Sequence, residues 1–299
     1  MRSNPNTCLP GTWAPTAAPP LAVAYSIALA AERAREDVAD GYRLYWLASG
    51  RFGSCDVPLD GFVVVGRHAL CDAVLDADPT IALRHLLVRA SRLDDGMPRL
   101  AVLDLHTNLG FSLDGGRNAN AIAATGALAF HVGAYAVVAL PGGEPPPEEL
   151  PAARVVAAEA SHPYREARGA PSSITLLPRA PFVGESWEPG HACSTVSLTS
   201  ARASATVRVS PLDLELGVLV GRAPKCNGVL RTVLNDGISR VHLLLRRDVA
   251  YDLSSTQGTF VNGARVRKAR LEESVIVQLG TVSPVYLRVT PLARAATAS

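Results

Sequence analysis

The chain has 299 residues, enough for two ordinary domains, and 48% of them are hydrophobic, so a large core is possible. Its formal net charge is +2, and no run of Lys or Arg exceeds two residues. A nucleic-acid-binding surface needs basic residues gathered on one face, so this pattern argues against nucleic acid as a partner.

The N-terminal segment, residues 1–40, has many prolines at first and no apolar stretch of signal-peptide type. Its second half, residues 21–37, is apolar at the start and charged at the end. This pattern predicts a short amphipathic helix that covers the edge of a domain.

The five cysteines stand at scattered spacings without a Cys-x-x-Cys pair, and the histidines have no metal-ligand spacing. We therefore expect reduced thiols in a cytoplasmic protein, with no metal and no cofactor. The abundance of Ala and Arg is typical of a GC-rich, bacterial genome.

Two regions with strand-like patterns, residues 41–141 and 206–292, are separated by a segment rich in proline and small residues. Such a composition buries little apolar surface, so residues 142–205 are predicted to be a flexible linker. Residues 293–299 form a short tail.

The two strand-rich regions carry the same short sequences in the same order. VPLDGFVVVGR (57–67) and SPLDLELGVLVGR (210–222) share Pro-Leu-Asp, an apolar strand and Gly-Arg, and IALRHLLV (81–88) matches ISRVHLLL (238–245) at its ends and at the histidine.

The same order continues after these sequences. DLHTNLGFSLDG (104–115) aligns without a gap to DLSSTQGTFVNG (252–263), and HVGAYAVVAL (131–140) matches QLGTVSPVYLRV (278–289) around a glycine.

Short apolar runs separated by Gly, Asn and Asp turns are typical of all-β proteins. The repeat therefore predicts two twisted antiparallel β-sandwiches joined by a Pro/Ala-rich linker, with a short N-terminal helix. Asn262-Gly263 and Asp114-Gly115 are the dipeptides preferred in tight hairpin turns. The uncharged segment 118–143 has the length of a membrane span, but its repeat partner is charged, so we expect strands and no span.

Three short sequences in the second region carry groups suited to one anion. Arg222 follows Gly221 after a strand, Ser239-Arg240 begins an apolar run, and Ser255-Thr256 lies in a turn. Loops cluster at the ends of a sandwich, so these groups can converge on a phosphate dianion.

These sequences and their order resemble the forkhead-associated (FHA) domain, a phosphothreonine-binding module. The resemblance covers roughly residues 205–292 and rests on Gly221-Arg222, Ser239-Arg240-Val241-His242, 255–258 and Asn262-Gly263. It implies that Arg222, Ser239 and Thr256 hold the phosphate, with Arg240 and Ser255 beside them.

The resemblance also implies structural roles for Gly221, His242, Gly258, Asn262 and Gly263. One position departs from the family: Gln257 stands where an Asn usually grips the peptide backbone. Gln keeps the amide but adds a rotatable bond, so we expect altered reach.

The first repeat keeps the frame and loses ligands. Gly66-Arg67 and His85 are retained, and Thr107 and Asn108 stand opposite Ser255 and Thr256. Ala82 replaces Ser239 and Leu83 replaces Arg240, which predicts a divergent FHA-like domain without phosphopeptide binding.

The sequence therefore predicts an adaptor, not an enzyme, that reads phosphothreonine in a Ser/Thr kinase or its substrate. The alternative is a phosphate-independent scaffold in which both sandwiches dock partners. A hydrolase triad of Ser239, His242 and Asp252 is disfavoured, because residues three apart in a strand point to opposite faces.

Overall fold

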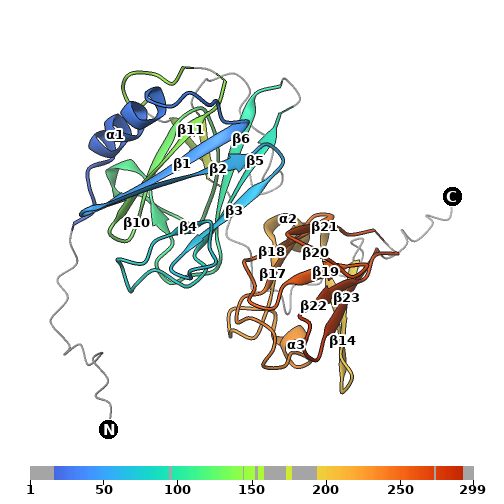
Figure 1. Ribbon diagram of the computed structural model, residues 1–299. Helices are drawn as coiled ribbons and strands as arrows, with labels where there is room; N and C mark the ends of the chain where they lie inside the picture. Colours follow the sequence, from blue (N-terminus) through green and yellow to red (C-terminus); the bar gives the residue numbers. More distant parts are fainter. Residues whose placement is uncertain are drawn as a thin grey trace, which may run out of the picture.

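The computed structural model describes residues 17–93, 96–143, 145–151, 154–157, 173–176, 194–272 and 274–291. These residues form two β-sandwiches with few helical residues, as Figure 1 shows. The prediction of an all-β protein with two sandwiches is confirmed.

The first domain has two sheets. Their strand orders are β2-β1-β11-β10-β7-β8 and β12-β13-β9-β6-β5-β3-β4. Its elements are α1 (Leu21–Arg33), β1 (Gly41–Ala48), β2 (Arg51–Pro58), β3 (Phe62–Gly66), β4 (Ala73–Val74), β5 (Leu86–Arg92), β6 (Pro98–Asp104), β7 (Phe111–Ser112), the 3-10 turn η1 (Asp114–Gly116), β8 (Asn118–Ala119), β9 (Ala121–Thr125), β10 (Leu128–Val132), β11 (Tyr135–Pro141), β12 (Arg154–Ala157) and β13 (Ser173–Leu176).

The second domain repeats this topology. Its strand orders are β15-β14-β23-β22-β19-β20 and β16-β17-β18-β21, which match the first domain strand for strand apart from β4, β12 and β13. Its elements are β14 (Ser194–Thr199), β15 (Ser204–Val209), α2 (Pro211–Leu216), β16 (Val218–Val220), α3 (Gly228–Arg231), β17 (Leu243–Arg246), β18 (Val249–Asp252), β19 (Thr259–Val261), β20 (Ala264–Val266), β21 (Lys268–Arg270), β22 (Val277–Leu279) and β23 (Val285–Pro291).

The strands next to the domain boundary are buried on both faces. In β3, Val63 and Val65 point into the core of the first sandwich, whereas Phe62 and Val64 point the other way and still are buried. Successive side chains of a strand alternate between faces, so a strand without polar alternation must be covered on both sides.

The second domain covers that outer face with its own equivalent face. Leu219 of β16 and Leu244 of β17 share one apolar cluster with Val64 and Leu87, which occupy the matching positions in the repeat. The ring of Phe62 meets that of Tyr251 edge to face, with centroids 5.1 Å apart. Each fully buried side chain of this size stabilises by about 1.5–3 kcal/mol, so the two domains form a packed pair.

Helix α1 packs on the outer face of the sheet formed by β1, β11 and β10. Its apolar side chains recur every three or four residues and are buried. They are Leu21, Ala24, Tyr25, Ala28 and Leu29. The predicted helix is therefore present, but it ends at Arg33 and covers a sheet face instead of a domain edge.

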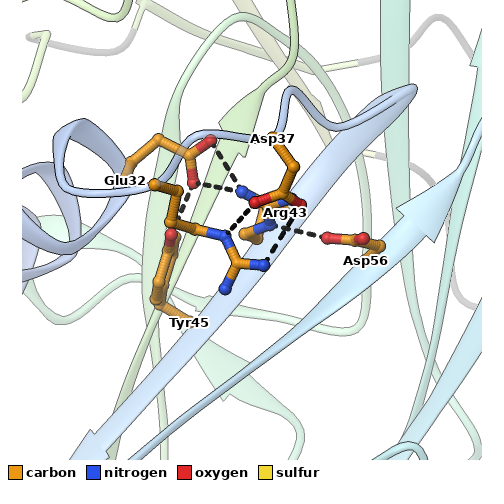
Figure 2. Close-up of polar contacts among 6 residues, drawn as sticks. Glu32, Asp37, Arg43, Tyr45 and Asp56 are labelled. Carbon is orange, nitrogen blue, oxygen red and sulfur yellow. Dashed lines mark hydrogen bonds and ion pairs between the residues drawn. The ribbon is translucent and has the colours of Figure 1, made fainter.

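A buried arginine fixes the end of this helix (Figure 2). The Arg43 guanidinium donates to Glu32 at 3.0 Å, to Asp37 at 2.7 Å and to Asp56 at 2.6 Å, and Tyr45 also donates to Glu32. Burial opposes the charge, but the carboxylates outweigh this effect and raise the pKa of Arg43. This cluster ties α1 and its following turn to β1 and β2.

The segment predicted as a flexible linker contains strands. β12 and β13 extend a sheet of the first domain, and β14 begins the second sandwich at Ser194, before residue 206. In β14, buried Val196 and Leu198 alternate with less buried Ser and Thr, so the small-residue composition concealed a half-buried strand. The rest of 142–205 lies partly outside the described residues.

The Pro-Leu-Asp of the second repeat is a helix, not the entry to a strand. Ser210 caps α2: its hydroxyl accepts from the Asp213 N–H at 3.1 Å, and Asp213 accepts from the Ser210 N–H at 2.8 Å. This capping box and Pro211 in the first helical turn favour a helix, so β16 is limited to Val218–Val220.

The predicted turns differ in outcome. Asn262 and Gly263 have φ of 50° and 79° and join β19 to β20, as a tight hairpin turn requires. Asp114-Gly115 instead opens η1, because the loop from β7 to β8 is longer than two residues. The uncharged segment 118–143 forms β8 to β11, and no helix in the described ranges is long and apolar enough to cross a membrane.

Candidate functional site

Three loops of the second sandwich carry the candidate residues: residues 221–227 between β16 and α3, residues 232–242 between α3 and β17, and residues 253–258 between β18 and β19. The buried His242 joins the second of these loops to the third. His242 Nδ1 accepts from the Ser239 N–H at 3.2 Å, and Nε2 lies 3.2 Å from the Gly258 carbonyl oxygen, to which it donates. Desolvation lowers the pKa of His242 to about 4, which keeps the ring neutral with one donor and one acceptor. The structural role implied for His242 fits this geometry.

Gly221 lets the first loop approach the second. A Cβ atom at this position would overlap the Arg240 carbonyl oxygen, and the Ala223 N–H donates to that same oxygen at 2.7 Å. Because only glycine fits such a close backbone approach, this position brings Arg222 beside Ser239.

Arg222 is oriented by the backbone of the second loop. Its Nε donates to the Ile238 carbonyl oxygen at 2.6 Å, and its Nη1 pairs with the fully exposed Asp236 at 3.2 Å. The guanidinium therefore reaches solvent from a fixed stem, and an exposed ion pair of this kind is weak enough for a phosphate to replace.

Ser239 links the second loop to the third. Its Oγ accepts from the Thr256 N–H at 3.0 Å, which leaves the hydroxyl hydrogen for another acceptor. Thr256 and Arg240 are both exposed. The structure thus brings Arg222, Ser239 and Thr256 together on bonded loops, with Arg240 next to Ser239 in the chain.

Ser255 does not belong to this surface, contrary to the prediction. It is fully buried, its Oγ donates to Asp252 Oδ2 at 2.5 Å, and its N–H donates to Asp252 Oδ1 at 2.8 Å. Thr259 donates to the same carboxylate at 2.6 Å. Ser255 and Asp252 therefore fix the shape of the third loop from inside.

This arrangement also removes the triad. Ser239 and His242 lie in the loop before β17, not in a strand, and the Ser239 hydroxyl pairs with Thr256 while both ring nitrogens of His242 are engaged elsewhere. No three His, Cys, Asp or Glu side chains in the described part of the chain are grouped as metal ligands.

Gln257 uses its longer side chain within the protein. Its Oε1 accepts from the N–H groups of Thr281 at 3.3 Å and Val282 at 3.1 Å. The extra methylene therefore lets the amide reach the loop between β22 and β23. Asn262 is exposed in its hairpin turn, where its positive φ, with that of Gly263, shapes the backbone.

The first domain has the same loop frame. Arg67 Nε donates to the Ile81 carbonyl at 3.1 Å, the Ala82 N–H donates to His85 Nδ1 at 3.1 Å, and His85 Nε2 lies 2.8 Å from the Gly110 carbonyl oxygen. These contacts match those of Arg222, Ser239 and His242 position by position. Desolvation likewise lowers the pKa of His85.

That frame keeps Arg67 but lacks most of the other candidate phosphate ligands. Thr107 is buried on Asp104 in the way that Ser255 is buried on Asp252. Asn108 is exposed where Thr256 stands, and the exposed apolar side chains of Leu83 and Leu109 replace Arg240 and Gln257. The equivalent surface of the first domain is therefore more apolar and carries fewer donors.

Part of the chain is similar to known proteins. Residues 218–280 match the family model of the FHA domain, and no curated protein matches the chain. The FHA domain of the CT664 protein from Chlamydia trachomatis is 21% identical over 34% of this chain and 100% of its own, with a TM-score of 0.28. FHA-1 of Rv1747 from Mycobacterium tuberculosis is 24% identical over 34% of this chain and 99% of its own, with a TM-score of 0.27.

A third solved structure, from work on phosphothreonine-dependent FHA domain interactions, is 30% identical over 33% of this chain and 99% of its own, with a TM-score of 0.27. The assignment rests on the family model and on the loop geometry. The second domain is an FHA domain, and the first, with the same strand order and loop frame, is a divergent FHA-like repeat.

Proposed function

We propose that the protein is an adaptor whose second domain binds partners through a phosphothreonine placed there by a Ser/Thr kinase. The observation that carries this proposal is the bond from the Thr256 N–H to Ser239 Oγ beside the Arg222 stem, since it gathers the donors of three loops. A phosphate dianion accepts charge-assisted hydrogen bonds worth about 1.5–3 kcal/mol each.

The first domain acts without phosphate in this proposal. It offers Arg67 and Asn108, but Ala82 and Leu83 provide no side-chain donor where Ser239 and Arg240 stand in the second domain. A single guanidinium is a poor site for a dianion. The outer face of the first domain's sheet is instead occupied by packing against the second domain.

A peptide array with paired phosphorylated and unphosphorylated threonine peptides tests the proposal on the full chain. Arg222→Ala should abolish binding to the phosphorylated members, and the matched change Arg67→Ala should leave it unchanged. If the chain captures the unphosphorylated peptides equally well, or Arg222→Ala has no effect, the phosphate-independent scaffold is the better account.

A further inference from the structure

A buried arginine of the first domain, Arg84, contacts the third loop of the second domain. Arg84 precedes β5 of the first domain, and only 5% of it is exposed. Its Nε donates to the Leu253 carbonyl oxygen. Its Nη2 donates to the Ser254 carbonyl oxygen at 2.5 Å. Both acceptors belong to the third loop of the FHA domain.

The bonded carbonyls lie close to Thr256 along the chain. Ser254 has a φ of 56° and its counterpart His106 in the first domain has a φ of 53°, so this left-handed residue belongs to the loop that both domains share. The peptide unit between Ser254 and Ser255 is held on both edges, because Arg84 binds its carbonyl and Asp252 accepts from its N–H. Thr256 follows Ser254 by two residues, which span at most about 7 Å.

Arg84 also brings a positive charge behind the loop. Among the described residues, the hydrogen-bond acceptors of its guanidinium are these two carbonyl oxygens and no carboxylate. A guanidinium stays charged at any relevant pH, and a buried charge is screened less than an exposed one. Its charge favours a phosphate bound at the loop, and the Asp252 carboxylate beneath the loop offsets part of this effect.

The two domains contact each other's third loop with residues from different positions of the repeat. Arg84 occupies the position of Val241 in the second domain, so the two domains differ here although the loop frame is shared. Lys225 of the second domain donates to the carbonyl of Leu105, the counterpart of Leu253, in the loop that has lost its ligands. Each domain thus clamps the third loop of the other.

We propose that Arg84 is a positioning residue of the phosphopeptide site, so that the first domain completes the site of the second. This inference rests on the proposed function and deepens it. It gives the divergent domain a role without a ligand of its own: it holds the loop that carries Thr256 and adds charge behind it.

Titrations of the full chain with a phosphothreonine peptide, selected from a degenerate library on the wild type, test the inference. We expect Arg84→Met to weaken binding by roughly tenfold, because the loop that carries Thr256 loses two hydrogen bonds and the charge behind it. Arg84→Lys keeps the charge and one donor and should recover most of the loss. Lys268→Met is the control, because it removes a different hydrogen bond between the domains. Lys268 donates to the Asp60 carbonyl oxygen at 2.6 Å, before the first residue of β3, whereas Arg84 lies near its last residue. The affinity of this variant should stay within twofold of the wild type.

The outcomes separate this inference from the proposed function. If the wild type selects no phosphothreonine peptide, the proposed function is wrong and the inference falls with it. The inference alone is overturned if the wild type binds and the affinity of Arg84→Met stays within twofold of it. It is also overturned if Arg84→Met and Lys268→Met weaken binding equally. Failure of Arg84→Lys to recover affinity would contradict the role of the charge.

Discussion

Ser239 has two roles in this account, and Ser239→Ala separates them. The hydroxyl oxygen accepts from the Thr256 N–H at 3.0 Å, which connects the second and third loops. Its hydrogen is the donor expected to reach the phosphate. The substitution removes one oxygen from a residue that is 8% exposed and leaves the rest of the loop frame in place.

The two losses have different magnitudes. A neutral hydrogen bond contributes about 0.5–1.5 kcal/mol to folding, so the free energy of unfolding should fall by about 1 kcal/mol. A bond to a charged group is worth about 1.5–3 kcal/mol, so phosphopeptide affinity should fall by about 10- to 150-fold. Affinity should therefore suffer more than stability.

Calorimetric titration and urea unfolding of the same preparations measure both quantities. Ser200→Ala is the matched control, because that serine makes equivalent local bonds in the exposed turn between β14 and β15. A Ser239→Ala protein that binds as tightly as the control would refute the phosphate role of the hydroxyl.

Two further predictions concern the buried groups under the site. Ser255→Ala should lower the free energy of unfolding by about 1–3 kcal/mol, because Asp252 loses a buried partner. The folded protein should bind phosphopeptide within twofold of the wild type, because the Ser255 N–H still donates to Asp252 and Arg84 still binds the Ser254 carbonyl oxygen. A large loss of affinity without a loss of stability would instead place Ser255 at the ligand. The second prediction concerns His242, whose pKa is about 4 in the folded protein against 6.5 in the unfolded chain. Below pH 6.5 the unfolded chain takes up a proton that the folded chain does not, so the stabilisation is present above this pH and is lost as the pH falls. The free energy of unfolding should drop by about 2 kcal/mol between pH 7 and pH 5. His85 shifts in the same direction, and urea midpoints that stay level over this range would contradict the neutral, buried rings.

Several residues of the site can be predicted from short sequences, because the backbone geometry there allows few residue types. Gly221 is required where a Cβ atom would overlap a carbonyl oxygen, and Asn262-Gly263 is required where a tight turn needs positive φ. The internal repeat then places Gly66 and His85 in equivalent settings. Such positions are predictable because few residue types satisfy them.

Other features depend on contacts that no short sequence records. Ser255 and Thr256 carry the same functional group, and their sequence alone does not say which one faces inward. The spacing of three residues from Asp252 to Ser255 was the available signal, because an Asp side chain commonly accepts from nearby backbone N–H groups.

The contact between the domains was missed for a similar reason. The runs of apolar residues in β3 and β17 lack the alternation of a half-exposed sheet, which signals that both faces are covered. That signal does not identify the partner, and the role of Arg84 follows only from its bonds across the boundary.

The central claim is that one of two equivalent loop frames binds phosphothreonine. Calorimetric titration of the full chain with a selected phosphothreonine peptide tests it through the stoichiometry. The account predicts one site per chain, which Arg222→Ala removes and Arg67→Ala retains. Two sites per chain, or binding that survives Arg222→Ala and disappears with Arg67→Ala, would contradict it.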